Sequence, residues 1–176
     1  MQNTEIVGEM IEGKATASGE TDHLPTDEWT TATLAHASVL LTLVLGMAGG
    51  IGAPIGLAVP AVMYLGYRER SRFVAFHALQ SLVYQVIGIL SYIVFTAAMG
   101  VWATAAWHIS GWLSAILIGF LLMPLALLLT LLTGLLLVGA PLAWAGYGLY
   151  AAYQVYQGGR FYYWLIGKQL EKEVKL

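Results

Sequence analysis

Residues 67–85 read YRERSRFVAFHALQSLVYQ, and this stretch decides the fold class because a cluster of arginines leads directly into an apolar helix. The cluster, Arg68, Arg70 and Arg72, lies between two long apolar regions. A short basic loop between membrane spans is typical of the cytoplasmic face of a membrane protein. We therefore expect this loop to be cytoplasmic and either to set the orientation of the chain or to contact a partner.

A helix over about 73–100 is predicted to follow this loop. Neither a proline nor a charged residue interrupts it, so it is long enough to cross a hydrocarbon core of about 30 Å. Polar residues recur along it at i, i+4 spacing or in the adjoining row, and they form one polar intramembrane face. That face comprises His77, Gln80, Ser81, Tyr84 and Gln85. Because polar side chains are costly against lipid, we expect it to look into a bundle, a partner subunit or a wet cavity.

The composition of the chain supports a membrane location. Of its 176 residues, 59% are hydrophobic and 10% are charged, against about 25% charged residues in soluble domains. The chain has no cysteine, which excludes disulfides and thiolate metal sites. Its net charge of -2 hides an asymmetry, because most acidic residues precede the first span and most basic residues follow it. This distribution does not resemble a nucleic-acid-binding surface.

The N-terminal half is predicted to contain a tail and a broken hairpin. Residues 1–25 are acidic and poor in apolar side chains, and we interpret them as a disordered tail. The membrane domain, 26–159, begins with helices over about 32–48 and 53–67, separated by a glycine-rich cluster. These arms form either a tight hairpin of short helices or one broken span, since each is shorter than a comfortable span of roughly 17–25 residues. The cluster could line a cavity, as in transporters, but close helix packing through small residues is the favoured interpretation.

The second half is predicted to return the chain to the side from which it started. Trp102, Trp107 and Trp112 resemble an aromatic belt on the far side of the membrane. A kinked helix over about 113–157 follows, and it could cross once or twice. The later basic residues lie on the same side as the arginine cluster if the chain between them crosses the membrane an even number of times. This favours a single crossing by the helix over about 113–157, and it places both termini in the cytoplasm.

The C-terminal tail, 160–176, is predicted to contain a short amphipathic helix. Glu171 and Lys175 are spaced for an i, i+4 pair along it. Such a helix lies along the lipid headgroups or docks on a partner, and the interfacial position is the simpler of the two.

The sequence indicates no enzymatic activity and no metal site. It has no HExxH, GxSxG or phosphate-binding loop, and no acidic residue lies within an apolar run. Two histidines, His36 and His77, could ligate a haem or a chlorin if their helices lie side by side. A lone histidine in a membrane bundle is more often a hydrogen-bonding core residue.

Five stretches resemble a known family. They are 34–38 (LAHAS), 52–54 (GAP), 72–80 (RFVAFHALQ), 118–124 (IGFLLMP) and 151–163 (AAYQVYQGGRFYY). Their residues and order are similar to those of small bacterial membrane proteins related to the core membrane subunit of the chloroplast inner-envelope Tic protein translocon. The resemblance implies four membrane helices with both termini cytoplasmic, and a channel-like or translocon-associated role in the plastid branch. The tryptophan-rich segment and the absence of a lysine before the closing glycines depart from that pattern and affect the expected partner contacts.

The predicted fold class is therefore an all-α integral membrane protein, a four-helix transmembrane bundle with a broken first hairpin and a C-terminal interfacial helix. We expect a multi-pass protein of the bacterial cytoplasmic (inner) membrane that acts as a scaffold or as a channel-like, translocon-like subunit. Its expected partners are the lipid bilayer and other membrane subunits or further copies of itself, and not nucleic acid. No cofactor is expected, and the alternative is an accessory subunit of an energy-converting complex that holds haem or chlorin.

Overall fold

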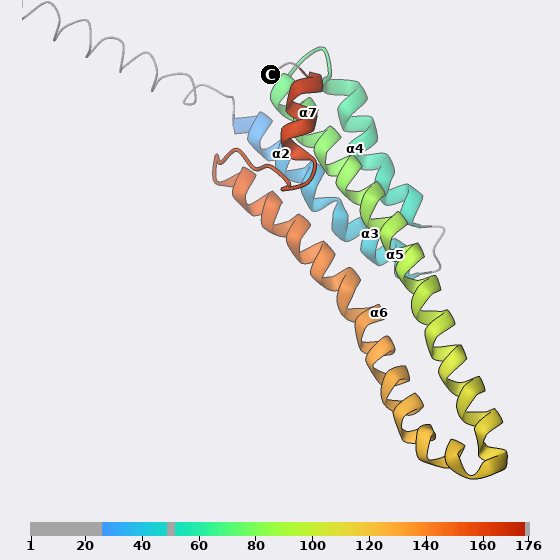
Figure 1. The fold of residues 1–176 in the computed structure, drawn as a ribbon. Helices are drawn as coiled ribbons and strands as arrows, with labels where there is room; N and C mark the ends of the chain where they lie inside the picture. Colours follow the sequence, from blue (N-terminus) through green and yellow to red (C-terminus); the bar gives the residue numbers. More distant parts are fainter. Residues whose placement is uncertain (1–25, 49–51, 175–176) are drawn as a thin grey trace, which may run out of the picture.

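Helices make up most of the computed structural model, which describes residues 26–48 and 52–174 (Figure 1). The predicted tail, 1–25, lies outside the described residues, as does Lys175 of the predicted Glu171–Lys175 pair. Three helical stretches in the described part are long and apolar enough to cross a membrane: Asp27–Met47, Arg72–Ile116 and Ile118–Tyr156. The all-helical membrane class follows from these lengths and compositions. A complete four-helix transmembrane bundle stays a prediction, because the remaining apolar helix has only 15 residues.

The first stretch consists of α2 (Thr26–Ala37) and α3 (Val39–Met47), which Ser38 joins with little interruption. The amide of Ser38 donates to the carbonyl of Leu34, and the amide of Thr42 donates to the carbonyl of Ser38. Helical hydrogen bonding therefore continues through the junction. α2 also begins where the sequence favours a helix start, since Asp27 and Glu28 in its first turn complement the positive end of the helix dipole.

The short helix α4 (Ala53–Tyr67) returns beside α3, and the glycines of the connecting cluster explain how closely the two pack. A Cβ added at Gly56 would overlap Thr42, and one added at Gly52 would overlap the backbone of Leu45. Small residues let the two backbones approach, so this geometry favours the packing interpretation of the cluster.

α5 (Arg72–Leu113) has 42 residues and is about 63 Å long, roughly twice the hydrocarbon thickness of a bilayer. It begins at Ser71, whose hydroxyl caps the helix by accepting the amide of Val74. The sequence led us to expect a helix ending near 100 and an interfacial tryptophan segment beyond it. The structure instead continues α5 through that segment, because no proline interrupts it and isolated glycines do not end a helix.

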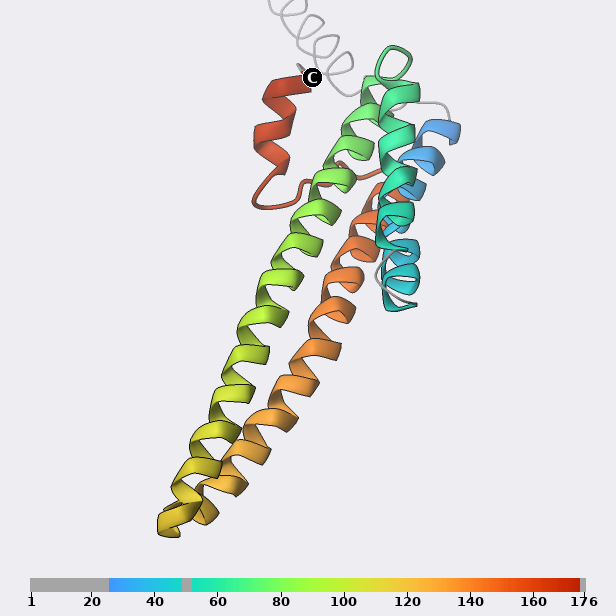
Figure 2. The ribbon, with the colours of Figure 1, turned by 90° about the vertical axis from the view of Figure 1, so that its right-hand side faces the viewer.

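The chain reverses after α5 in a short turn. The 3-10 helix η2 (Ser114–Ile116) leads to Leu117, which has a left-handed backbone with φ of 65°. α6 (Ile118–Tyr156) then runs back for 39 residues, about 58 Å, and its helical hydrogen bonding continues past Pro124 and Pro141. α5 and α6 therefore form a hairpin whose far part extends well beyond the other helices (Figure 2).

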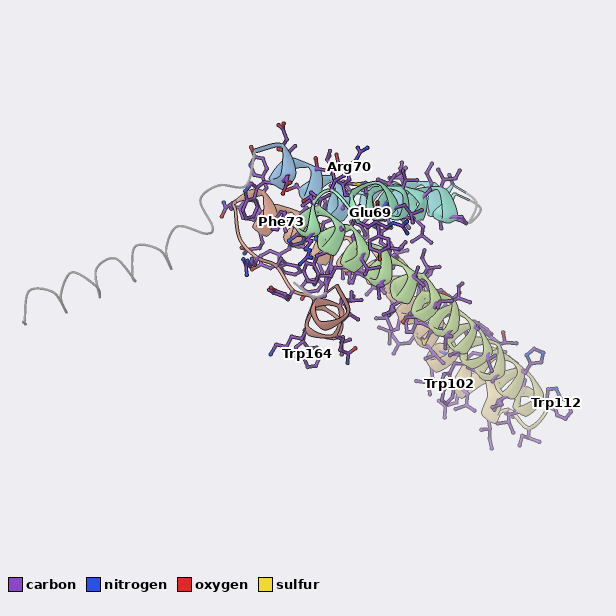
Figure 3. The ribbon with its side chains drawn as sticks, turned by 90° about the horizontal axis from the view of Figure 1, so that it is seen from above. Glu69, Arg70, Phe73, Trp102, Trp112 and Trp164 are labelled. Atoms are coloured by element: carbon purple, nitrogen blue, oxygen red, sulfur yellow. The ribbon has the colours of Figure 1, made fainter. Side chains whose placement is uncertain are left out.

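The two ends of the molecule differ in charge. The start of α2, the loop between α4 and α5, the end of α6 and the last helix, α7 (Gly167–Val174), lie together at one end (Figure 1). The sequence between Arg72 and Arg160 contains no Asp, Glu, Lys or Arg, so the far part of the hairpin carries no formal charge. Figure 3 views the molecule from the charged end, with Glu69 and Arg70 near the viewer, Trp112 at the distant tip and Trp102 before it along the hairpin.

A polar core at the base of the hairpin

The predicted polar face lies at the base of the hairpin, where α2, α3, α5 and α6 meet. His77, Gln80, Ser81 and Gln85 are fully buried there, and Tyr84 is partly buried at the edge. The i, i+4 ladder on α5 turns these side chains toward the first helical stretch, which contributes His36, Ser38 and Thr42.

Gln85 is the centre of one group of hydrogen bonds. Its side-chain oxygen accepts the hydroxyl of Thr42 at 2.6 Å. Its side-chain nitrogen donates to Ser38 Oγ at 2.8 Å and to Ser81 Oγ at 3.1 Å. Ser81 in turn donates to the carbonyl of Ala35 at 2.6 Å. Gln85 and Ser81 together therefore fasten α5 to α3, to the junction at Ser38 and to α2.

The two histidines contact each other across the α2–α5 interface. His36 Nε2 lies 3.1 Å from His77 Nδ1, and His36 Nδ1 lies 3.2 Å from the hydroxyl of Tyr163. A single N–H between the two rings satisfies the first contact. Both ring nitrogens of His36 are thus engaged within the protein, as expected of a hydrogen-bonding core histidine.

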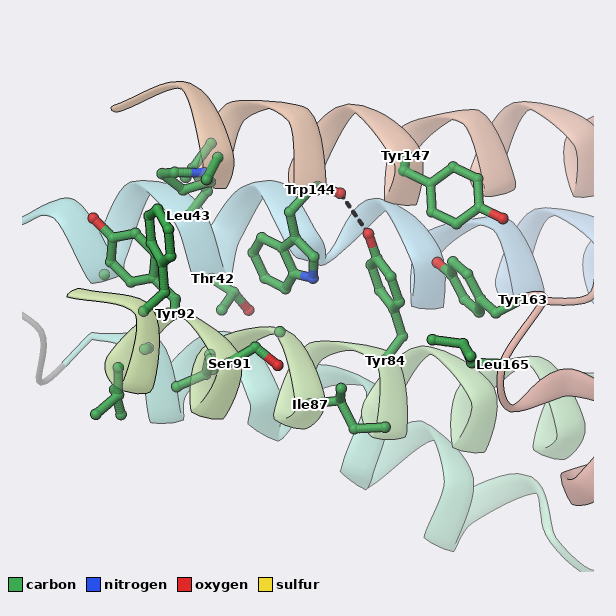
Figure 4. A pocket seen from close by; sticks show the side chains of 18 of the residues that line it. Thr42, Leu43, Tyr84, Ile87, Ser91, Tyr92, Trp144, Tyr147, Tyr163 and Leu165 are labelled. Carbon is green, nitrogen blue, oxygen red and sulfur yellow. Dashed lines mark hydrogen bonds between the residues drawn. The ribbon is translucent and has the colours of Figure 1, made fainter. Parts of the chain in front are cut away.

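Tyr163 reaches this core because the chain turns back after α6. Gly158, with φ of 80°, ends the helix, and the following residues cross the bundle end as irregular chain. Gln80 holds that segment through two hydrogen bonds, with its side-chain amide assigned the orientation that satisfies both. Its nitrogen donates to the carbonyl of Phe161, and its oxygen accepts the backbone N–H of Tyr163. The ring of Tyr163 also stacks on that of Tyr84 at a centroid distance of 4.0 Å, and both rings line an apolar cavity of about 910 Å³ between α3, α5 and α6 (Figure 4).

Tyr163 remains protonated over a wide pH range. Burial raises the pKa of its hydroxyl, and the neighbouring hydroxyls of Tyr84 and Tyr147 raise it further. The group can therefore serve His36 as a neutral hydrogen-bond partner.

The arginine loop lies apart from the polar core. Arg68 and Arg70 are exposed between α4 and α5, and Arg68 lies 3.5 Å from the carboxylate of its neighbour Glu69. Arg72 occupies the first position of α5, also at the surface. The structure therefore separates the predicted site residues into a buried hydrogen-bonded core and an exposed basic loop.

Sequence reasoning missed three members of the core. Ser38 and Thr42 repeat the i, i+4 spacing of Ser81 and Gln85 on the facing helix, and this matching pair of ladders was a usable signal. Tyr163 gave no such signal, because it lies in a run of aromatic residues, 161–164, that has no helical pattern of polar side chains. Its neighbour Trp164 is 87% exposed, whereas Tyr163 is buried.

The fold and this core define the class: a small α-helical membrane protein whose short helices are fastened by buried hydrogen bonds to the base of a long apolar hairpin. Within the described part of the chain, no group of three or more His, Asp or Glu residues is placed to hold a metal ion.

The chain belongs to the magnetosome magnetite crystal formation protein family, whose model matches residues 27–170. This match covers most of the chain and includes every residue of the polar core, from His36 to Tyr163. It supports the prediction of a small bacterial membrane protein family. It shows no link to the chloroplast translocon subunit, so that relationship stays a prediction. Neither the curated proteins nor the solved structures contain a match to this chain.

Proposed function

We propose that this protein is a non-enzymatic membrane scaffold that takes part in the formation of magnetite crystals. The observation that carries the proposal is the charge-free hairpin of α5 and α6, fixed at its base by the polar core. A scaffold needs a rigid element of defined direction, and hydrogen bonds between α2, α3 and α5 supply that rigidity. The role in crystal formation is taken from the description of the family.

The geometry of the polar core favours a scaffold over a channel-like subunit. A conducting path needs polar groups that face water, whereas Gln85, Ser81, Ser38 and Thr42 bond to one another in the interior. The engagement of both ring nitrogens of His36 likewise favours a structural role for the histidines over ligation of a haem or chlorin.

We further propose that the charged end faces the cytoplasm and that both termini lie there. The described charged residues gather at this end, and the basic ones include Arg68, Arg70 and Arg160. A basic loop between apolar helices is retained on the cytoplasmic side during insertion. The exposed apolar surface of the hairpin would then meet lipid, further copies of the chain or other membrane subunits.

A gene deletion in a magnetite-forming bacterium that carries this gene tests the proposal. We expect the size or shape distribution of the crystals, measured by electron microscopy, to change in the deletion strain and to recover with the wild-type gene. A His36→Asn and His77→Asn double variant that accumulates in the membrane should also restore it, because the amide side chains can still form hydrogen bonds in the core but do not replace an imidazole ligand. Unchanged crystals in the deletion strain, or complementation that strictly requires the imidazoles, would contradict the proposal.

A further inference from the structure

The arginine loop, residues 68–72, joins α4 to α5 and includes the first residue of α5. It contains three arginines and one glutamate, so its net charge is +2. The positive end of the α5 dipole lies at the same place and adds to this charge. The loop is therefore a positively charged surface at the charged end of the molecule, where Figure 3 shows Glu69 and Arg70 near the viewer.

Little of this charge is neutralised by the described residues. Arg68 lies 3.5 Å from the carboxylate of Glu69, but both side chains are largely exposed, and such a pair is weak. The side chain of Arg70 is exposed and forms no ion pair with a described residue. The other acidic residues near this loop, Asp27 and Glu28 in the first turn of α2, likewise form no ion pair within the described chain. The loop can therefore accept an acidic partner.

The segment that precedes α2, residues 1–25, has the opposite charge. It holds half of the ten acidic residues of the chain and one lysine, so its net charge is -4 with neutral histidine. The acidic residues are Glu5, Glu9, Glu12, Glu20 and Asp22. The chain therefore carries its own acidic partner for the loop, on a segment that lies outside the described residues.

The acidic segment joins the described chain beside the loop. The ring of Trp29, in the first turn of α2, contacts the ring of Phe73, the second residue of α5, at a centroid distance of 4.5 Å. Phe73 follows Arg70 by three residues, which is at most about 10 Å of chain. Glu20 and Asp22 precede the first residue of α2 by six and four residues, which can span up to roughly 20 Å and 14 Å. Their carboxylates can therefore reach the loop without any movement of the helices.

We propose that the acidic segment, residues 1–25, docks on the arginine loop of its own chain, with Glu20 and Asp22 nearest the guanidinium groups of Arg68 and Arg70. A short tether keeps the segment at a millimolar effective concentration, so ion pairs that are individually weak act together. Salt weakens the contact because the groups are exposed. Docking also leaves the loop less available to anionic lipid headgroups. The segment and the loop lie on the same side of the membrane in either orientation, so this proposal does not depend on the proposed function.

Disulfide formation within the full-length protein tests this proposal, because the chain has no cysteine of its own. Thr21→Cys and Glu69→Cys are combined, and the rate of the intramolecular disulfide is measured in micelles of an uncharged detergent. We expect this rate to be at least about threefold higher at roughly 20 mM salt than at 1 M salt, where the Debye length falls to about 3 Å.

Removal of charge at matched positions shows whether the acidic segment itself makes the contact. Glu20→Gln with Asp22→Gln, in the same cysteine background, should lower the rate at low salt by about threefold or more, because the carboxylates nearest the loop are lost. Asp27→Asn with Glu28→Asn is the matched control, since it removes two carboxylates from the first turn of α2 and none from the segment. This control should not lower the rate.

Charge reversal separates the contact from folding. Arg68→Glu with Arg70→Glu should slow disulfide formation, and the addition of Glu20→Arg with Asp22→Arg should restore it, because the two charges are exchanged. Circular dichroism and gel filtration verify that each variant is folded. A rate that does not depend on salt, a control that is slowed equally, or a reversed pair that stays slow would overturn the proposal. So would a wild-type-charge rate in phosphatidylglycerol nanodiscs as low as that of Glu20→Gln with Asp22→Gln, since lipid headgroups would then hold the loop.

Discussion

Gln85 makes three side-chain hydrogen bonds within the buried core. It accepts from Thr42 and donates to Ser38 and Ser81, and it is fully buried. Gln85→Leu keeps the volume but leaves the three hydroxyls without this partner. We expect a loss of about 1–3 kcal/mol in the free energy of unfolding, measured by thermal or denaturant unfolding of the purified protein in detergent.

Gln157→Leu is the matched control for this prediction. Gln157 is exposed just after α6, and its side-chain nitrogen donates to the hydroxyl of Tyr153 at the surface. The same substitution there should change stability by less than about 0.5 kcal/mol. Equal effects at the two positions would show that the buried network does not stabilise the fold.

Tyr163 should make stability depend on pH in the alkaline range. Burial raises the pKa of Tyr163 above the value of about 10 for an unperturbed tyrosine, so the folded state keeps the proton to higher pH than the unfolded state. This contribution is fully present below pH ~10 and is lost as the pH rises through the folded pKa. We expect the melting temperature of the wild type to fall above pH ~10, and that of Tyr163→Phe to fall less steeply.

Tyr156→Phe, at an exposed position on the last turn of α6, serves as the control and should follow the wild-type profile. The readout is the slope of melting temperature against pH, because Tyr163→Phe also removes the contact with His36 and lowers stability at every pH. Identical alkaline slopes for the wild type and Tyr163→Phe would refute the assignment.

Among the elements, the pairing of α3 with α4 depends on a glycine contact. A Cβ at Gly56 would overlap Thr42, whereas one at Gly66, on the same helix, would meet nothing within 4 Å. Gly56→Ala should therefore destabilise the protein by about 1–3 kcal/mol, since two backbones must separate. Gly66→Ala should be neutral or stabilising by up to about 1 kcal/mol, because alanine favours the helix. Both are measured by unfolding in detergent, and a stabilising Gly56→Ala would contradict the packing interpretation.

The hairpin of α5 and α6 should not tolerate a charge on its outer surface. Leu128 is 53% exposed on α6 and faces outward within an apolar stretch that can cross a membrane. A lysine at the centre of a membrane helix costs roughly 2.5–3.5 kcal/mol of insertion free energy. We expect Leu128→Lys to reduce the fraction of protein that resists carbonate extraction from membranes.

The comparison variant is Leu165→Lys, at a residue that is 70% exposed but lies outside the three apolar stretches. It should leave membrane insertion unchanged. Equal extraction of the two variants would show that this part of the hairpin is not surrounded by hydrocarbon.

At the scale of the whole molecule, the absence of cysteine makes the proposed topology directly measurable. Cysteines introduced singly at Glu69 and Lys168 lie at the charged end, and one at Ser114 lies at the tip of the hairpin. A membrane-impermeant maleimide should label the first two from the cytoplasmic side and should leave the third unlabelled from that side. Labelling of Glu69→Cys and Lys168→Cys from opposite sides would overturn the proposed orientation.

Particular residues show how far sequence reasoning extended. The i, i+4 ladder of His77, Ser81 and Gln85 indicated a shared face, because helical periodicity fixes which side chains point the same way. Periodicity says nothing about which distant residue meets that face, so the contact with Tyr163 could not be inferred. The far end of α5 was misjudged for a related reason: tryptophans are common at membrane interfaces, but they do not break a helix.

The sequence by itself determined the class of protein and the distribution of charge, since both follow from local composition: long apolar stretches must be helical in a membrane, and the 87 residues between Arg72 and Arg160 carry no charge. Only the tertiary structure decided that the polar face is closed by His36, Thr42 and Tyr163, and that a cavity remains between the hairpin helices. These features depend on contacts between residues far apart in the chain, where close packing and the satisfaction of buried hydrogen bonds select one arrangement among many that share the same local pattern.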